Sequence, residues 1–384
     1  MAPIGILYCI DSLQRGGTEL QLAGLLQRLD RTRFQPHLCT LRRSDSSLRP
    51  ADCPHLELDL PALLRPRAGS AVWRLRSYLR QRDIAIVQTF FQDATLIGAV
   101  AAWLARTPAR IGCFRDLGFW RNRKEEFRLR CAYPFLTGFL ANSEAVKDHI
   151  CQVDGLSPDR ITVIPNGIDP RLFPFVEHTE QQLAVGFVGN LNRRVKRADL
   201  FIRAAGRLAP DFPDVTWHVL GDGVLRPECE ALAASLQLGD RMVFTGRIAG
   251  VSDYLERLAV GVLCSDSEGF SNAVLEYMLR GNAVVATAVG GNREAIQTEL
   301  TGLLVPAGDD AALAEAIGRF LRDRELRQAC AVRARRAAVE RYDWSNTLAL
   351  HEEYYQRALG RSVATASASV PTETTDNGAK GAAL

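Results

Sequence analysis

Two acidic residues frame the start of a helical pattern in the stretch "SDSEGFSNAVLEYMLR", residues 265–280. Glu268 follows an apolar run typical of a buried strand, and Glu276 stands one turn into a helix that Asn272 is expected to cap. The free N–H groups at a helix start bind anions. Glu268 would then accept hydrogen bonds from hydroxyls of a group attached to the anion, and Glu276 would accept two ribose hydroxyls. The competing interpretation is a helix with an acid near its start for dipole reasons and an exposed glutamate.

Two adjacent glycines after the first apolar run suit a similar anion. Gly16 and Gly17, in "RGGTE", let the backbone approach a phosphate closely at the start of a helix. Taken alone, such a pair is more typical of a turn. The three spaced glycines of the dehydrogenase fingerprint do not occur here.

The elements that must position these residues alternate between short β-rich runs and longer helical patterns, which is typical of parallel sheets covered by helices. The predicted strands are 4–10, 34–41, 55–60, 84–90, 109–114, 138–143 and 161–167, then 183–190, 215–223, 241–248, 260–267, 283–291 and 302–309. The proline-broken segment between the two series predicts a linker at 171–182. The sequence therefore predicts an α/β fold with two Rossmann-like, doubly wound domains, 1–170 and 183–345.

The last part of the chain predicts one helix and a tail. An incomplete apolar stripe over 346–359 predicts a helix that packs on a domain surface. Residues 360–384 are rich in Ala, Ser, Thr and Gly and carry few large apolar groups, so we expect a disordered tail.

The composition is that of a soluble globular protein, because 47% of the 384 residues are apolar and 24% are charged. The nine cysteines form no close pairs and have no histidines at metal-ligand spacing, which indicates reduced cytosolic thiols and argues against a zinc site. The N-terminal "MAPIGILYCID" lacks a basic leader, and no apolar run approaches the roughly 20 residues of a spanning helix. We therefore expect a cytoplasmic protein.

Positive charge is concentrated in the first half, where residues 1–170 carry 23 basic and 17 acidic side chains, against 24 and 27 in residues 171–384. The segments 65–82 and 120–130 mix arginines with aromatic residues. These segments are interpreted either as core-packed helices with a solvated face or as a peripheral contact with anionic lipid at the inner face of the membrane. Base-reading motifs are missing, so no nucleic-acid partner is expected.

Several motifs in order carry a family resemblance. The stretch "SDSEGFSNAVLEYMLRGNAVVATAVGGNREAI" with "TGLLVPAGD" resembles the nucleotide-binding half of the family 4 glycosyltransferases, which are retaining enzymes of the GT-B fold. The motifs "GGTE", "ANSEAVK", "VIPNGID" and "VGNLNRRVKRADLFIRA" extend the resemblance over roughly residues 4–356. It implies transfer of a sugar from a nucleotide diphosphate sugar, a UDP- or GDP-sugar, to a hydroxyl of a cell-surface glycan or lipid-linked acceptor, without metal or cofactor.

The resemblance also implies roles for individual residues. Glu268 would touch the donor sugar, Glu276 would bind the ribose, and the glycine pair would close over the donor phosphate. Family members carry an arginine and a lysine six positions apart where this chain has Asn190 and Lys196, so Arg193 or Arg194 is expected to supply the missing charge for the leaving diphosphate. The competing interpretation is a solvated basic loop. The expected donor-binding set is Gly16, Gly17, Asn190, Arg247, Phe270, Ser271, Asn272 and Glu276.

The largest departure from the family follows the predicted strand 109–114, where many members place a histidine and this chain has Arg115 and Asp116. Both are candidates for the acceptor side, with Asp116 orienting a hydroxyl, although a local ion pair is an equal interpretation. The expected catalytic set is Glu268, Lys196, Arg193 and Asp116. Two alternatives remain open, a nucleotide-sugar epimerase of the same fold and a non-catalytic nucleotide-sugar-binding protein.

Overall fold

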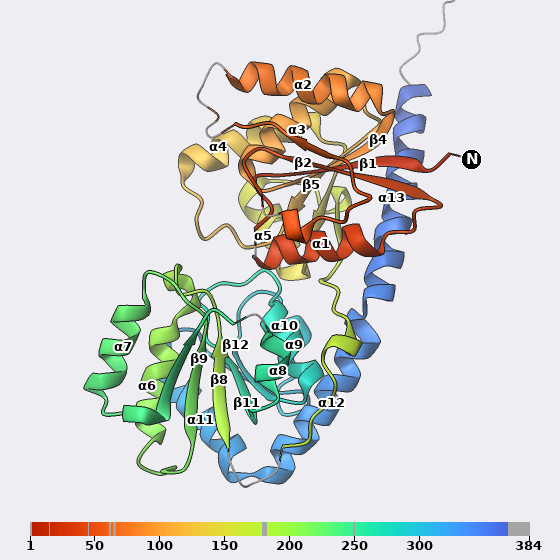
Figure 1. Ribbon diagram of the computed structural model, residues 1–384. Coiled ribbons are helices and arrows are strands. Elements are labelled where there is room, and N and C mark those ends of the chain that lie inside the picture. The colour runs from red at the N-terminus through yellow and green to blue at the C-terminus, as the bar shows by residue number, and fades with distance from the viewer. Residues whose placement is uncertain are drawn as a thin grey trace, which may run out of the picture.

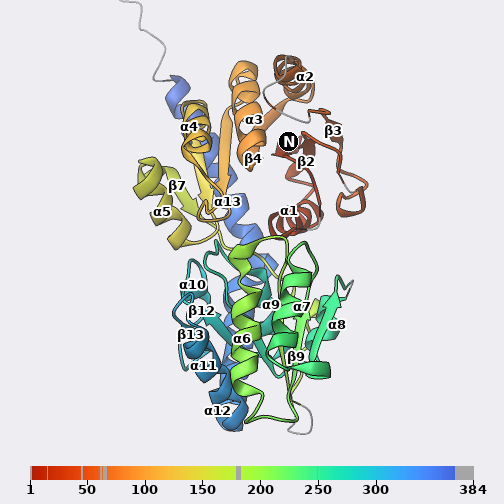
Figure 2. The same ribbon diagram turned by 90° about the vertical axis from the view of Figure 1, so that its left-hand side faces the viewer.

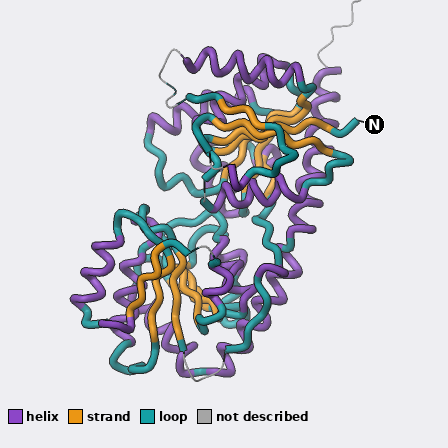
Figure 3. The backbone as a smooth tube through the Cα atoms, in the orientation of Figure 1, coloured by secondary structure: helices purple, strands orange, loops and turns teal. Residues whose placement is uncertain are grey.

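Two parallel sheets, each covered by helices on both faces, make up the computed structural model (Figures 1 and 3). It describes residues 2–14, 16–44, 46–60, 63, 67–178, 183–248 and 250–367. Every predicted strand is present and begins within one residue of its expected start. The predicted fold class, α/β with two Rossmann-like doubly wound domains, is therefore confirmed.

The N-terminal sheet has seven parallel strands in the order β3-β2-β1-β4-β5-β6-β7. These strands are β1 (Ile4–Ile10), β2 (Phe34–Thr40), β3 (His55–Glu57), β4 (Ile84–Phe90), β5 (Ala109–Phe114), β6 (Gly138–Ala141) and β7 (Ile161–Val163). Its helices are α1 (Gly17–Arg28), α2 (Arg67–Gln81), α3 (Gln92–Ala105), α4 (Arg123–Ala132) and α5 (Glu144–Asp154). The strand order reverses between β1 and β4, and ligands of such sheets bind beyond the carboxyl ends of the strands at that point.

The C-terminal sheet has six parallel strands in the order β10-β9-β8-β11-β12-β13. These strands are β8 (Ala184–Val188), β9 (Thr216–Leu220), β10 (Met242–Gly246), β11 (Val260–Leu263), β12 (Ala283–Thr287) and β13 (Leu303–Val305). Its helices are α6 (Ala198–Leu208), α7 (Arg226–Ser235), α8 (Val251–Leu255), α9 (Asn272–Arg280), α10 (Asn292–Ala295), α11 (Asp310–Arg322) and α12 (Arg324–Tyr342), and a short 3-10 turn, η5, spans Arg194–Lys196. Here the order reverses between β8 and β11. Figure 2 shows the two domains stacked, with α1 of one above α9 of the other.

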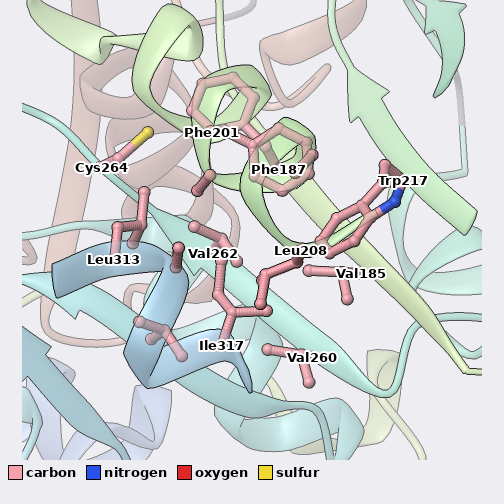
Figure 4. Close-up of a cluster of buried hydrophobic side chains, with 14 of the residues drawn as sticks. Val185, Phe187, Phe201, Leu208, Trp217, Val260, Val262, Cys264, Leu313 and Ile317 are labelled. Atoms are coloured by element: carbon pink, nitrogen blue, oxygen red, sulfur yellow. The ribbon is translucent and has the colours of Figure 1, made fainter. Parts of the chain in front are cut away.

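Large apolar side chains fix α6 and α11 on the C-terminal sheet (Figure 4). Phe187 on β8 stacks on Phe201 of α6 with ring centroids 5.9 Å apart, and the Trp217 ring meets Phe201 edge-on at 6.3 Å. Ile317 of α11 is fully buried in the same cluster. Strands that are buried on both faces have continuous apolar sequences, so their positions could be predicted well.

The chain passes between the domains twice, first after β7 near Ile168 and again after α12 near Asp343. These two crossings lie side by side. Ile168 and Asp343 form an isolated parallel bridge. The indole of Trp344 fills the space beside Gly24 of α1 and Gly167 of the first crossing, where a Cβ on either glycine would overlap the ring. Both crossings are therefore held against the N-terminal domain.

Helix α13 (Trp344–Ser367) returns the chain to the N-terminal domain, and Figure 1 shows it running along that domain in blue. Tyr355 is fully buried there, and its hydroxyl donates a hydrogen bond to Gln88 Oε1 at 2.7 Å. The helix starts earlier and ends later than the predicted 346–359, so the predicted disordered tail is helical over 360–367. The rest of that tail, 368–384, and residues 179–182 of the predicted linker lie outside the described residues.

The basic segment 65–82 forms α2, and its apolar stripe packs inward. Leu75 and Leu79 are buried against the sheet, and Val72 packs beside them. This supports the interpretation of a core-packed helix, although Trp73 on the same helix is 56% exposed. Within the described ranges, no helix is both long and apolar enough to cross a membrane.

Candidate functional site

The loop between β11 and α9 carries the first predicted acid to the carboxyl end of the C-terminal sheet. Glu268 lies in this loop, as predicted, and its carboxylate is buried. Gly290, with φ +48°, packs against the backbone of Glu268. A Cβ on Gly290 would overlap the carbonyl oxygen of Glu268. Helix α9 is capped by the Ser271 hydroxyl, which accepts a hydrogen bond from the N–H of Val274, so the prediction that Asn272 caps this helix was wrong.

Lys196 and Glu268, predicted from separate motifs, form an ion pair in the structure. The Lys196 Nζ lies 2.6 Å from Glu268 Oε1, and the Ser265 hydroxyl donates to the same oxygen at 2.6 Å. The Lys196 side chain is 27% exposed and the Glu268 side chain 9%, so the pair is partly shielded from water. An ammonium group is therefore held in a fixed place beside the start of α9.

The other basic residues of the 190–197 loop point in different directions. The Arg194 guanidinium pairs with Glu228 on α7 at 2.8 Å, away from the N-terminal domain. The Arg193 guanidinium instead lies 5.7 Å from the ring centre of Phe119, which belongs to the N-terminal domain. Arg193 thus contacts the N-terminal domain and Arg194 does not, and the assignment of either arginine to the leaving diphosphate stays a prediction.

Asn190 and Arg247, both predicted to bind the donor, lie at the surface and make no contact with another described residue that indicates a ligand site. Asn190 is exposed, and its Oδ1 accepts a hydrogen bond from the N–H of Asn192 at 2.7 Å, which shapes its own loop. Arg247 is exposed just beyond the end of β10. Their assignment to the donor site stays a prediction.

Glu276 lies on the face of α9 that is turned toward α1. It lines a pocket of about 240 Å³ together with α1, the first domain crossing and Trp344. Burial raises the pKa of the Glu276 carboxyl to about 7. A carboxyl group that is costly to ionise, and that faces a pocket between two domains, is a candidate ligand-binding group.

The carboxylate of Glu19 lies at the start of its own helix, α1. Gly16 precedes the helix without any side-chain cap, and the Glu19 carboxylate lies so close that a Cβ on Gly16 would overlap it. Burial raises the pKa of Glu19, while its own backbone N–H and the charge of Arg193 act in the opposite direction. The Glu19 carboxylate therefore covers the predicted anion site at Gly16.

Amide side chains join the two domains around the start of α9. Asn166 Nδ2 donates to the carbonyl oxygen of Phe270 at 3.1 Å and to Asn272 Oδ1 at 2.6 Å. Asn272 Nδ2 donates to the carbonyl oxygen of Gly17 at 3.3 Å, and Gln21 Nε2 donates to Asn272 Oδ1 at 3.1 Å. Asn272 is thus a bridge between α9 and α1.

A second cross-domain contact caps a helix. The backbone N–H groups of Glu144 and Ala145, at the start of α5, donate to the Glu294 carboxylate of α10 at 3.1 and 3.0 Å. A carboxylate at a helix start is favoured by the helix dipole. The C-terminal domain therefore supplies a cap for a helix of the N-terminal domain.

Arg115 and Asp116, which replace the histidine of the family, do not form an ion pair within hydrogen-bonding distance. The Arg115 guanidinium donates to Asn166 Oδ1 at 2.6 Å, and burial lowers its pKa. Asp116 instead accepts from the N–H of Gly118 at 2.8 Å and from the Trp120 indole at 3.0 Å. Asp116 therefore shapes the segment 116–120, and its role toward an acceptor stays a prediction.

No group of three or more His, Cys, Asp or Glu side chains suited to a metal ion occurs among the residues that the structure describes. All nine cysteines are free thiols, and Cys9, Cys39 and Cys264 are fully buried.

Comparison with known families covers most of the chain. Residues 15–172 match the profile described as Glycosyltransferase Family 4, and residues 182–323 match the one described as Glycosyl transferases group 1. A D-inositol 3-phosphate glycosyltransferase of Corynebacterium urealyticum is 34% identical over 334 residues, which are 78% of this chain and 77% of that protein. A lipopolysaccharide core biosynthesis mannosyltransferase of Rhizobium leguminosarum bv. viciae is 34% identical over 181 residues, 43% of this chain and 51% of that protein.

Solved structures share the architecture. The Anabaena protein HepE in complex with UDP has a TM-score of 0.80 at 22% identity, covering 92% of this chain and 100% of that one. Sucrose-phosphate synthase of Thermosynechococcus elongatus has a TM-score of 0.79 at 19% identity, covering 93% and 100%. The two facing domains thus have the GT-B glycosyltransferase fold. The chain belongs to the family 4 glycosyltransferases, as its motifs predicted.

Proposed function

We propose that this protein is a retaining glycosyltransferase that moves a sugar from a UDP- or GDP-sugar to a hydroxyl of a cell-surface glycan or of its lipid carrier. The observation that carries the proposal is the Lys196–Glu268 pair just before α9, next to Gly269, which packs on the backbone of Arg115 in the N-terminal domain. Solved structures of Anabaena HepE contain UDP and UDP-glucose, which supports a nucleotide-sugar donor here.

In the proposed mechanism each side chain has a separate task. Lys196 and Arg193 stabilise the negative charge that develops on the leaving diphosphate, because fixed positive charges act most strongly where water is scarce. Glu268 positions the donor sugar, and the backbone amides of residues 270–272 hold the sugar and diphosphate. The leaving phosphate takes the proton from the acceptor hydroxyl on the same face of the sugar, which retains its configuration.

The remaining predicted residues complete the two sides of the site. Glu276 binds the ribose, and Asn190 and Arg247 contribute to the donor side. Gly16 and Gly17 close over the donor phosphate, which requires the Glu19 carboxylate to move away from the start of α1. Arg115 and Asp116 serve the acceptor side.

Two outcomes would point to the alternative functions. An epimerase would convert the nucleotide sugar without any acceptor, so product analysis with the donor alone distinguishes it from a glycosyltransferase. A non-catalytic protein would bind the nucleotide sugar without turning it over.

The donor site is tested first by calorimetric binding of UDP, GDP, ADP and their sugar conjugates without metal. We expect one nucleotide series to bind, and Glu276→Ala to weaken that binding by about 1 kcal/mol or more, the net contribution of a typical hydrogen bond. If no nucleotide binds, the proposed function fails. If the native chain and Glu276→Ala bind equally, only the ribose assignment fails.

Donor affinity is expected to depend on pH through Glu276, whose pKa is about 7. Ribose hydroxyls donate to the ionised carboxylate, so binding favours loss of the proton and affinity rises with pH. If only the ionised form binds, affinity is about tenfold lower at pH 6 than at pH 8. The probe is the nucleotide diphosphate sugar, because its diphosphate diester does not titrate in this range.

Glu276→Gln supplies the control for this pH dependence. The variant keeps the size of the side chain but cannot ionise, so its affinity should be the same at pH 6 and pH 8. A native protein whose affinity is also flat over this range would contradict the assignment of Glu276 to the ribose.

We further propose that the protein is cytoplasmic and makes a peripheral contact with the membrane through the outer helices of the N-terminal domain. Trp73 of α2, Trp103 of α3 and Phe127 of α4 are 56%, 50% and 69% exposed. Helices α2 and α3 pack together, as do α3 and α4 (Figure 2). Exposed aromatic residues among arginines suit an anionic lipid surface.

Vesicle binding tests this contact. Replacing Trp73, Trp103 and Phe127 together by serine is expected to lower binding to vesicles of mixed anionic and neutral phospholipid by about tenfold. The matched control replaces Val224 and Leu300 of the C-terminal domain, which are 79% and 42% exposed. Equal binding of the triple variant and this control would contradict the membrane contact.

A further inference from the structure

Two buried asparagines contact Arg115, one at its backbone and one at its side chain. Asn142, from the motif "ANSEAVK", donates through Nδ2 to the carbonyl oxygen of Arg115 at 3.1 Å. Asn166, from the motif "VIPNGID", accepts through Oδ1 a hydrogen bond of 2.6 Å from the Arg115 guanidinium. The two asparagines are 2% and 3% exposed. Buried polar side chains are almost always hydrogen-bonded, so the partners of these amides show what they hold in place.

Asn166 extends the contact into the C-terminal domain. Its Nδ2 group donates to the carbonyl oxygen of Phe270 at 3.1 Å and to Asn272 Oδ1 at 2.6 Å. Its two amide hydrogens therefore have two acceptors, while its oxygen accepts from Arg115. Asn272 Nδ2 donates in turn to the carbonyl oxygen of Gly17 at 3.3 Å. We call this series, from Arg115 through Asn166 to Asn272, the amide relay.

The direction of the amide relay is set by the groups on either side of Asn166. A guanidinium group only donates hydrogen bonds, and a backbone carbonyl only accepts them. The Asn166 amide therefore fits between Arg115 and the Phe270 carbonyl in one orientation. If it were reversed, its NH₂ group would face the N–H of Arg115, and its oxygen would face the Phe270 carbonyl oxygen. A hydrogen bond from a charged donor is about twice as strong as one between neutral groups, so Arg115 holds Asn166 in this orientation.

The Phe270 carbonyl determines the direction of the next amide. In a planar trans peptide, the carbonyl oxygen and the following N–H point in opposite directions. Since the Phe270 carbonyl oxygen is held at Asn166, the Ser271 N–H is turned away from Asn166. Helix α9 begins at Asn272, and the first N–H groups of a helix have no acceptor within the helix. The amide relay therefore fixes the direction of N–H groups that can bind an anion.

We infer that Arg115 is a positioning residue, which acts through Asn166 to orient the backbone amides of residues 270–272 for the diphosphate of the donor. The inference rests on the proposed function, which assigns these amides to the donor sugar and diphosphate, and it gives Arg115 a task on the donor side of the site. Amides that buried hydrogen bonds hold in one orientation bind an anion without the cost of ordering them first.

Affinity for a nucleoside diphosphate and for the matching monophosphate tests the inference. The pair differs in the second phosphate, and the base is the one that the native protein binds best. Arg115→Met removes the charged donor, so we expect about tenfold weaker binding of the diphosphate, with binding of the monophosphate unchanged within about twofold. A general loss of stability would not separate the two ligands. Arg115→Lys retains a charged donor and should keep most of the diphosphate affinity.

Arg160→Met is the matched control. Arg160 is also a partly buried arginine of the N-terminal domain, and its Nη2 donates to the carbonyl oxygen of Leu136 at 2.7 Å. Because this contact lies within one domain, both affinities should be native in the variant. Thermal unfolding shows that each variant is folded.

The route through Asn166 is tested by combining two substitutions. Because Arg115 acts through Asn166, the double variant of Arg115→Met and Asn166→Ala should lose no more diphosphate affinity than Asn166→Ala alone. Hydrogen exchange of the Asn166 side-chain amide, followed by NMR with isotope-labelled asparagine, reports the same contact without any nucleotide. Exchange should be at least tenfold faster in Arg115→Met than in the native protein.

Each failure has a separate meaning. Native diphosphate affinity in Arg115→Met, an equal loss for both nucleotides, or additive losses in the double variant overturns the inference. If no nucleotide binds the native protein, the proposed function fails by itself. Amide exchange then shows whether Arg115 positions Asn166, and an equal exchange rate in the native protein and Arg115→Met overturns that as well.

Discussion

Replacing Lys196 by alanine is expected to lower the turnover of the nucleotide sugar by about 10² to 10³-fold, the usual cost of removing one group that stabilises charge in the transition state. The Lys196 ammonium is the only ion-pair partner that the described residues give to Glu268. The variant would leave the buried carboxylate with the Ser265 hydroxyl alone. Both the leaving diphosphate and the residue that positions the sugar would therefore be affected.

The matched control for this prediction is Arg194→Ala. Arg194 belongs to the same short turn, but it pairs with Glu228 on the outer surface, where such a pair contributes little. Turnover should stay within about twofold of the native rate. Rates of donor hydrolysis and sugar transfer are measured together with thermal unfolding. A folded Lys196→Ala variant with near-native turnover would remove this lysine from the mechanism.

Gly269→Ala is expected to lower kcat/KM by about 10²-fold, because displacements of about 1 Å in an active site have effects of this size. A Cβ on Gly269 would overlap the carbonyl oxygen of Arg115, which is backbone of the other domain and cannot rotate away. The two domains could then no longer approach as closely. Nucleotide affinity should change little, since Glu276 and the start of α9 stay in place.

Gly69→Ala provides the reference for a harmless glycine substitution, because a Cβ at that position of α2 meets no atom within 4 Å. The radius of gyration in solution and the kinetic constants are compared for both variants. A native kcat/KM for Gly269→Ala would show that the close contact between Gly269 and Arg115 is not required for activity. A loss of nucleotide affinity in proportion to the loss of turnover would show the same.

The positions of the strands could be predicted from the sequence because strands buried on both faces leave continuous apolar runs. The run 260–267 is an example, although β11 ends at Leu263. Beyond it, the Cys264 thiol donates to the carbonyl oxygen of Arg197, and the chain leaves the sheet to carry Ser265 and Glu268 to the site. A strand end set by such distant partners has no signal in local composition.

The contacts of individual polar residues were harder to predict. Asn272 was expected to cap α9, but Ser271 does so, and Asn272 bonds instead to Asn166 and Gln21 of the other domain. Local spacing allows either residue to cap, since both types are good caps. Only the position of the second domain decides between them.

Two acids were overlooked for a similar reason. The Glu19 carboxylate lies beside Gly16 at the start of its own helix, and the Glu294 carboxylate accepts hydrogen bonds from the start of a helix in the other domain. The spacing "GGTE" does place an acid in the first turn of α1, which was a usable signal for Glu19. No spacing relates Glu294 to α5, because about 150 residues separate them.

The return of α13 to the N-terminal domain has a consequence for biosynthesis. Trp344, Tyr354 and Tyr355 belong to the apolar core formed by the first strands, and the Tyr355 hydroxyl also pairs with that of Tyr8. A ribosome adding about 5 to 20 residues per second needs roughly 10 to 35 s to pass from residue 170 to residue 344. During that interval the N-terminal domain exposes an apolar groove, and the nascent chain completes its first domain only after its second has been synthesised.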